Sequence, residues 1–277
     1  MRKITCAVVV AVFVVAMPAS AAIQYEFFQK SSSDSTNSPA SDVTGRALID
    51  GARSRIDFVG GSMYPPGTYV ISTDGSRTMR FVDPINRSYT EVSTHSMASA
   101  IGTANLKIEN IQSSVTKLED RPIVAGIPAD HYRMTITYDI TMTVANMPLT
   151  QSIRTVVDRW TTVAFGDVGS AMGEPMLTGN AKADELIALE TNKIRGFALK
   201  EIVTITSTNP RHKALPGSQL QLPATRTRVR ETLVTQIREM RPEATSFVVP
   251  AAYTKFDAEN QPKQEQVHNV TLEPSGE

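Results

Sequence analysis

A strict alternation of apolar and polar residues between Tyr132 and Val144 is the longest regular pattern in the chain. Every second side chain in this span is apolar, and the residues between them are Thr, Arg or Asp. This period of two is typical of a β-strand with one buried face. At about 3.3 Å per residue the strand would run roughly 43 Å, about twice the usual length. The pattern therefore favours a large, strongly curved sheet over a small sandwich.

Short turn sequences predict that the N-terminal half forms an antiparallel meander. Asp50-Gly51, Asp74-Gly75 and the run 83–86 (Asp-Pro-Ile-Asn) all favour tight turns. Connections this short can join only antiparallel neighbours. Further strands are predicted over 23–29, 43–49, 53–58, 69–72, 78–82, 88–92, 151–165 and 199–207.

Helices are predicted at two places. Over 184–194 the apolar residues Leu186, Leu189 and Ile194 lie roughly on one side, and Gly196 favours a helix C-terminus there. A weaker helical pattern covers 94–106.

Four segments have less regular patterns. Segment 227–240 fits both a helical stripe and alternate strand positions, and its Thr and Val residues favour the strand. Segments 31–41 and 209–223 are predicted to be surface loops. The polar tail from Asp257 is predicted to be disordered.

The N-terminus has the three parts of a secretion signal. Arg2 and Lys3 supply a basic start, residues 8–17 an apolar run, and residues 19–21 (Ala-Ser-Ala) a small-residue cleavage site. The apolar run is too short to span a bilayer, and no later stretch is long enough to do so. The sequence therefore predicts an exported protein, periplasmic or secreted, with no transmembrane segment once the signal is removed.

Cleavage is predicted after Ala21 or Ala22, and an uncleaved anchor is the alternative. The chain is predicted to consist of three parts. Residues 1–22 are the predicted signal peptide, residues 23–256 a single β half-barrel domain, and residues 257–277 a disordered tail. The domain is long enough to bury a substantial hydrophobic core.

Cysteine content removes several classes of chemistry. The chain has one cysteine, Cys6, which lies inside the predicted signal and before its cleavage site. It cannot be the acylated cysteine that follows a lipoprotein signal. The mature part then contains no thiol, which excludes disulfides, cysteine-ligated zinc and thiol nucleophiles.

The charge balance gives no reason to expect nucleic acid as a partner. Removing Arg2 and Lys3 from the 28 basic residues leaves 26 against 28 acidic ones, a net charge near −2. Basic residues do occupy every second position at Arg226, Arg228 and Arg230. We interpret these as the polar face of a strand, with a patch for anionic headgroups as the alternative.

No complete catalytic or metal-binding motif occurs in the chain. The nucleophile elbow, the phosphate-binding loop, the dinucleotide fingerprint and the zinc-protease helix motif are all missing. His95, His131, His212 and His268 have no second ligand at metal spacing. Asp130 precedes His131, but strand neighbours point to opposite faces, so we expect an ordinary residue at the start of a strand. The sequence predicts a protein that is not an enzyme and holds no cofactor or metal.

The order of these parts resembles a known family. Residues 67–91, in which an Asp-Gly turn precedes Met79 and an aspartate-led turn precedes Tyr89, resemble the meander of exported bacterial proteins of the DUF4412 family. Residues 124–133 and 247–253 resemble its later strands, so the similarity covers roughly 43–256. That family is in turn similar to the LolA/LolB lipoprotein-carrier superfamily. The resemblance implies an incomplete antiparallel β barrel with a few covering helices, which holds acyl chains between sheet and helices.

Together these observations predict a mainly β protein that binds a hydrophobic ligand, a lipid or acyl chain, by burying apolar area in a pre-formed cavity. Transport of lipid or lipoprotein is a further expectation. One alternative is an interaction or sensor module of the cell envelope with a packed, ligand-free sheet, and another is a hydrolase with an unfamiliar site. The predicted cavity wall consists of Tyr69, Ile71, Met79, Phe81, Tyr132, Met134, Ile136, Tyr138, Ile140 and Met142.

Overall fold

Strands dominate the computed structural model, which describes residues 22–34, 40–93, 106–144, 147–166, 178, 180–209 and 224–256. Within these ranges twelve strands form one open sheet, two form a small hairpin, and one segment is helical. The sheet strands are β1 (Ala22–Ser33), β2 (Ser41–Asp50), β3 (Arg53–Gly61), β4 (Tyr69–Ser72), β5 (Thr78–Asp83), β6 (Ser88–Ser93), β7 (Lys107–Lys117), β10 (Asp130–Val144), β11 (Met147–Thr162), β12 (Phe197–Thr208), β13 (Thr225–Met240) and β14 (Thr254–Lys255). The hairpin pairs β8 (Ile123–Val124) with β9 (Ile127–Pro128).

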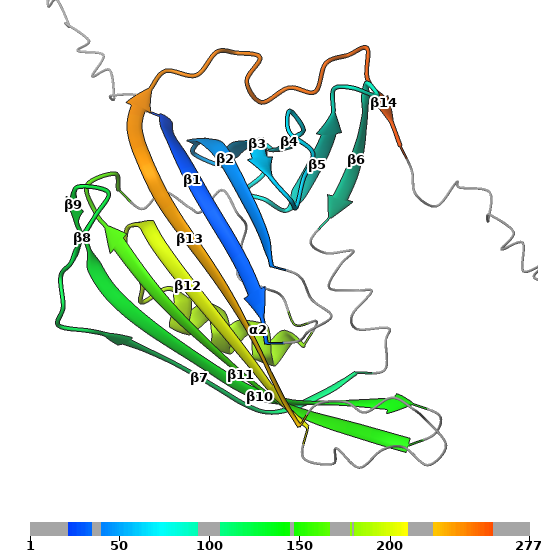
Figure 1. The fold of residues 1–277 in the computed structure, drawn as a ribbon, viewed down its shortest axis with the longest axis vertical. Coiled ribbons are helices and arrows are strands. Elements are labelled where there is room, and N and C mark those ends of the chain that lie inside the picture. Colours follow the sequence, from blue (N-terminus) through cyan, green and yellow to red (C-terminus); the bar gives the residue numbers. More distant parts are fainter. Residues whose placement is uncertain are drawn as a thin grey trace, which may run out of the picture.

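The large sheet has two arms that meet at β1. Its order is β14-β6-β5-β4-β3-β2-β1-β13-β12-β11-β10-β7, so β1 is hydrogen-bonded to β2 on one side and to β13 on the other. We call β2–β6 with β14 the first arm, and β7 with β10–β13 the second arm (Figure 1). Every pair is antiparallel except β14 and β6. The predicted meander is therefore confirmed as the first arm.

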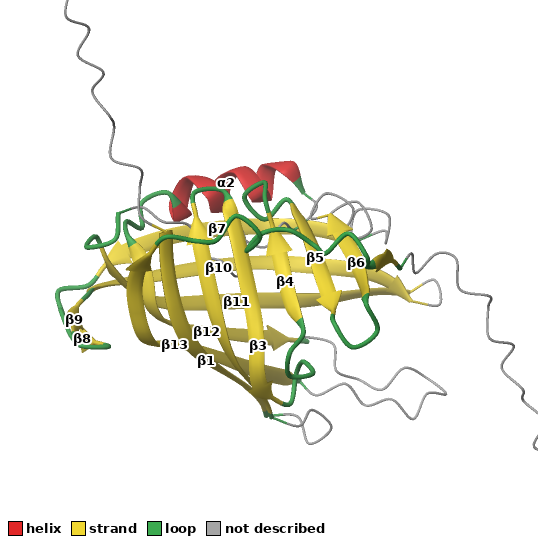
Figure 2. Ribbon diagram, turned by 90° about the horizontal axis from the view of Figure 1, so that it is seen from above, coloured by secondary structure: helices red, strands yellow, loops and turns green. Residues whose placement is uncertain are grey.

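The second arm contains the longest strands. β10 has 15 residues and β11 has 16, and they pair without interruption from Asp130 opposite Thr161 to Val144 opposite Met147. The long strand predicted from the alternation is confirmed. Bulges interrupt the register of four other strand pairs, and such bulges bend a sheet. Figure 2 shows the result, in which the sheet curls so that the strands of the two arms run in different directions. The prediction of a mainly β, strongly curved antiparallel sheet is thus confirmed.

Helix α2 (Ala181–Thr191) covers the outer strands of the second arm. Its N-cap is Asn180, whose side chain accepts a hydrogen bond from the backbone of Ala183. The helix packs against β7 and β10, where Glu190 accepts a hydrogen bond from the backbone of Val115 at 2.9 Å. Buried Ala183 and Ile187 form its inner side. The predicted helix over 184–194 therefore exists but begins and ends three residues earlier.

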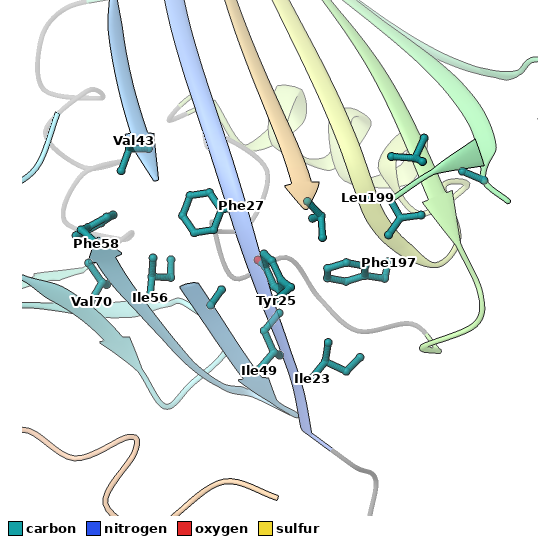
Figure 3. Close-up of a cluster of buried hydrophobic side chains, with 14 residues drawn as sticks. Ile23, Tyr25, Phe27, Val43, Ile49, Ile56, Phe58, Val70, Phe197 and Leu199 are labelled. Carbon is teal, nitrogen blue, oxygen red and sulfur yellow. The ribbon is translucent and has the colours of Figure 1, made fainter. Parts of the chain in front are cut away.

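Apolar side chains form two clusters on opposite faces of the sheet. The larger cluster lies on the concave face, where Tyr25 and Phe27 of β1 lie between side chains of the two arms (Figure 3). The smaller cluster lies on the convex face of the first arm, where Phe247 from the segment between β13 and β14 covers Tyr69 and Ile71. The first arm is thus buried on both faces.

Several predictions about the irregular segments can be compared with these elements. The ambiguous segment 227–240 is a strand, as predicted. The prediction that Ser31–Ser33 belongs to a loop is wrong, because β1 continues to Ser33 and pairs there with Arg228–Arg230 of β13. The weaker helix predicted over 94–106 lies outside the described residues apart from Leu106, and so does the tail from Asp257. Most of the loop over 209–223 and residues 1–21 of the predicted signal peptide also lie outside them.

A hydrogen-bonded carboxylate ties three strands of the second arm together. Asp139 of β10 accepts hydrogen bonds from Ser152 of β11 at 2.6 Å and from Asn110 of β7 at 2.7 Å. These bonds, that of Ser152 foremost, lower the pKa of the Asp139 carboxyl below its ordinary value of 3.8. A carboxyl whose pKa is lowered in the folded state stabilises the fold above its ordinary pKa. That stabilisation is lost as the pH falls through the folded-state pKa.

We therefore expect Asp139→Asn to be less stable than the wild type at pH 7, with the difference shrinking as the pH falls toward 3. The reason is that the wild-type carboxyl becomes protonated at low pH and loses the advantage of its charge. Urea unfolding of both proteins at pH 7, 5 and 3 measures the difference in free energy. A difference that stays constant over this range would contradict the assignment.

Candidate functional site

A cavity of 1170 Å³ lies on the concave face of the sheet, with α2 on one side. Residues of β1, β2, β3 and β10–β13 line it, together with Thr178, Ile187 and Thr191 at the helix. Thr191 lies close to the sheet, since its hydroxyl is 3.7 Å from the sulfur of Met134. The cavity therefore has a sheet floor and a helical cover.

One wall of the cavity is apolar because of the register of three neighbouring strands. Met134 of β10 lies opposite Val157 of β11, which in turn lies opposite Val203 of β12. Directly opposite residues in an antiparallel pair share one face of the sheet. A second row continues Ile136 through Thr155 to Ile205, and all of these residues line the cavity.

Aromatic and aliphatic side chains form the end of the cavity near the start of β1 and β12. Tyr25 and Phe197 meet edge to face with ring centroids 5.1 Å apart, and Leu199 is fully buried beside them. Phe27 also lines this end and is 1% exposed. These side chains belong to the larger apolar cluster, so the cavity is continuous with the hydrophobic core.

Charged residues line the cavity where β13 crosses the floor. Arg159 binds Glu201 with its Nε at 2.8 Å and its terminal nitrogen at 2.5 Å. Arg230 approaches the same carboxylate at 3.5 Å. Arg228 lies two residues earlier on the same face of β13. Arg226, Arg228 and Arg230 occupy alternate positions of the strand β13, as predicted, and Arg228 and Arg230 line the cavity on the concave face.

Three of the predicted wall residues, Met134, Ile136 and Tyr138, line the cavity. Burial raises the pKa of the Tyr138 hydroxyl above its ordinary value of 10.0, so this side chain is neutral at physiological pH. Tyr132 is buried on the same face of β10 beyond the lining residues, and Ile140 and Met142 continue that face toward the far end of the strand.

The predicted wall residues of the first arm lie elsewhere. Met79 and Phe81 pack against the larger cluster without lining the cavity. Tyr69 and Ile71 belong to the convex cluster under Phe247, so we correct their assignment to the cavity wall. Tyr69 and Ile71 point to the convex face of β4, and Val70 between them belongs to the larger cluster on the concave face.

Several lining residues were not predicted from the sequence. They come mainly from β1, β11, β12 and β13. In β1, Tyr25 and Phe27 alternate with Gln24 and Glu26. This alternation is the sequence signal that could have identified the cavity-lining face of β1. It did not show that β1 lies at the centre of the sheet, because that position depends on its pairing with β13.

His131 occupies a more elaborate setting than its sequence neighbours suggest. Its Nδ1 lies 2.9 Å from both carboxylate oxygens of Asp120, and its Nε2 lies 3.1 Å from Asp158. The ring stacks on Trp160 at 4.2 Å between centroids. Asp130 instead contacts Lys117 and Arg121. Both ring nitrogens are thus engaged by carboxylates of other segments.

Other features of the described residues can be stated briefly. No group of three His, Cys, Asp or Glu side chains within the described ranges could hold a metal ion. Within the described residues, no helix is long and apolar enough to cross a membrane. His95, His212 and His268 lie outside the described residues.

Comparison with solved structures finds a distant similarity. No protein-family model matches the chain, and no curated protein matches it. A crystal structure of a LolA superfamily protein from Nitrosomonas europaea aligns with 83% of this chain and 91% of that chain, at 9% sequence identity and a TM-score of 0.29. Membership of the DUF4412 family therefore stays a prediction, and the fold assignment rests on the sheet described above.

Proposed function

We propose that this protein binds a hydrophobic ligand, a lipid or an acyl chain, non-covalently in the cavity on the concave face. The observation that carries the proposal is the mostly apolar wall formed by Met134, Ile136, Val157, Val203 and Ile205 in a cavity of 1170 Å³. Sites for small molecules have volumes of roughly 300–1,000 Å³ and are mostly apolar. The cavity is large enough for such a ligand.

Burial of apolar area would supply the affinity. Each methylene group removed from water contributes about 0.8 kcal/mol, so an acyl chain with ten buried methylenes gains roughly 8 kcal/mol before the costs of association. A net binding free energy of about 8 kcal/mol would correspond to a dissociation constant of about 1 μM, and the costs of association make the binding weaker than this. No bond is made or broken, so the proposal includes neither catalysis nor a cofactor.

In its finer form the proposal places this binding outside the cytoplasm. Residues 1–22 have the pattern of a secretion signal, and the family resemblance implies transport of lipids or lipoproteins. We propose a periplasmic or secreted carrier on these grounds. The alternative of an interaction module requires a sheet packed by its own side chains, and the cavity favours the ligand-binding proposal.

Ile136→Asp is expected to weaken binding of a fluorescent fatty acid by about tenfold or more. A carboxylate in the apolar wall must be desolvated when an acyl chain covers it, which is unfavourable. The matched control is Thr137→Asp, since the next residue of β10 points to the opposite face. Fluorescence titration of the purified variants gives both dissociation constants, and circular dichroism checks that each protein is folded.

Organic extraction of the purified protein, followed by mass spectrometry, tests whether a lipid is already bound. The expected result is a lipid recovered from the wild type and a smaller amount from the Ile136→Asp variant. Recovery of no lipid, together with no binding of the fluorescent fatty acid, would overturn the proposed function.

A further inference from the structure

Polarity changes in steps along the two central strands that cross the floor of the cavity. Phe27 of β1 lies opposite Val234 of β13. Two residues further along β1, Gln29 lies opposite Thr232. Beyond it, Ser31 lies opposite Arg230 and Ser33 lies opposite Arg228. All of these residues line the cavity. The floor therefore passes from apolar through neutral polar to cationic within a few residues.

The cationic end also adjoins the apolar wall. Val203 of β12 lies directly opposite Arg230, and Ile205 directly opposite Arg228. Since neighbouring strands are about 4.8 Å apart, Arg230 and Met134 are separated by three strand spacings, roughly 14 Å. A single extended molecule could thus contact the arginines at one end and the apolar wall along its length.

Among the described residues that line the cavity, carboxylates balance only part of the positive charge at this end. Among the described residues that line the cavity, Glu201 is the only carboxylate, and it binds Arg159 at 2.5 Å and Arg230 at 3.5 Å. No ion pair joins Arg228 to a carboxylate in the part of the chain that the structure describes, and its side chain is exposed. Glu201 therefore neutralises only part of the combined positive charge of Arg228 and Arg230, because it also binds Arg159.

We propose that the ligand is an amphiphile with an anionic headgroup, a carboxylate or a phosphate monoester, which binds Arg228 and Arg230 while its chain lies along the apolar wall. This inference rests on the proposed function and adds the chemical class of the ligand. Guanidinium groups bind carboxylate and phosphate oxygens through paired hydrogen bonds. The hydroxyl of Ser31, opposite Arg230, supplies a further donor.

The test compares a fluorescent fatty acid with its uncharged methyl ester on the purified protein. The wild type is expected to bind the acid about tenfold more tightly than the ester at low salt, and the preference should shrink as salt is added. The double variant Arg228→Gln/Arg230→Gln should lose the preference while binding the ester within about twofold of the wild type. Because both side chains are exposed, the double variant is expected to fold, which thermal unfolding checks.

Arg238→Gln is the matched control, since Arg238 lies on the same strand but binds Gln24 outside the cavity lining. It should keep the preference for the acid. Equal binding of acid and ester by the wild type, or a preference that survives in the double variant, would overturn this inference alone. Failure of both probes to bind would overturn the proposed function as well.

A further experiment uses inorganic phosphate alone as the competitor. It separates a lipid headgroup from a free anion as the source of the charge. Phosphate at ordinary buffer concentrations is expected to change the dissociation constant of the fatty acid by less than about twofold. The reason is that phosphate lacks the buried chain that supplies most of the affinity. Displacement of the fatty acid by low concentrations of phosphate would overturn the inference in favour of a site for a small anion.

Discussion

Gly196→Ala is expected to lower the free energy of unfolding by about 3 kcal/mol or more. Gly196 links α2 to β12 with a φ of 86°, a left-handed conformation that costs an L-residue roughly 1–2 kcal/mol. A Cβ at this position would also lie 2.4 Å from the carbonyl oxygen of Thr162. That oxygen belongs to the backbone and cannot rotate away, so overpacking adds about 1–3 kcal/mol.

Gly126→Ala separates the two contributions. Gly126 has a similar φ of 79° in the β8–β9 hairpin, but a Cβ on this residue would meet no atom of another segment within 4 Å. This variant should lose only the conformational part, about 1 kcal/mol. Urea unfolding of both variants gives the comparison. Equal losses at the two positions would show that the contact with Thr162 carries no cost.

Phe27→Ala is expected to be comparably damaging, with a loss of about 3–5 kcal/mol. Phe27 is 1% exposed on the central strand, between side chains of both arms (Figure 3). Its ring fits so closely over Gly45 that a Cβ on this glycine would lie 2.5 Å from it. Truncation would therefore enlarge the cavity at its apolar end and remove contacts to both arms at once.

The neighbouring phenylalanine provides the control for this variant. Phe28 is 37% exposed and points to the other face of the same strand, so Phe28→Ala should cost less than about 1 kcal/mol. Both free energies come from urea unfolding. If the two variants lost similar amounts of stability, the central strand would not hold the arms together through its concave side.

Local patterns in the sequence were sufficient to predict most of the strands. The alternation in β10 and the turn residues around β2–β6 predict these elements to within a few residues. Even Thr225–Met240, which also fits a helical stripe, is a strand, as its Thr and Val residues favoured. Local chemistry decides these elements because each has a clear period or a clear turn at its end.

The faces of the first arm could not be predicted in the same way. All four residues of β4 are buried, so this strand has no polar face that would show which side chains point inward. Only the path of the segment that carries Phe247 over the convex face assigns Tyr69 and Ile71 to that side. This packing joins residues far apart in the chain and leaves no periodic signal.

Long-range pairing also explains the residues of the site that the sequence did not reveal. The run Ser31–Ser33 has the composition of a loop, and it is a strand because β13 supplies hydrogen-bonding partners over its whole length. The arginines on β13 were visible at alternate positions. Their placement beside the apolar wall depends on the register between β12 and β13.

The central position of β1 sets a constraint on biosynthesis. During translation β1 and the first arm leave the ribosome long before Thr225–Met240, the strand that must pair with the other side of β1. Until then the nascent chain exposes a twelve-residue edge of unpaired amide and carbonyl groups, which can template wrong associations. Contacts of such wide sequence separation also form slowly. Newly made chains should therefore depend on chaperones that shield this edge until synthesis is nearly complete.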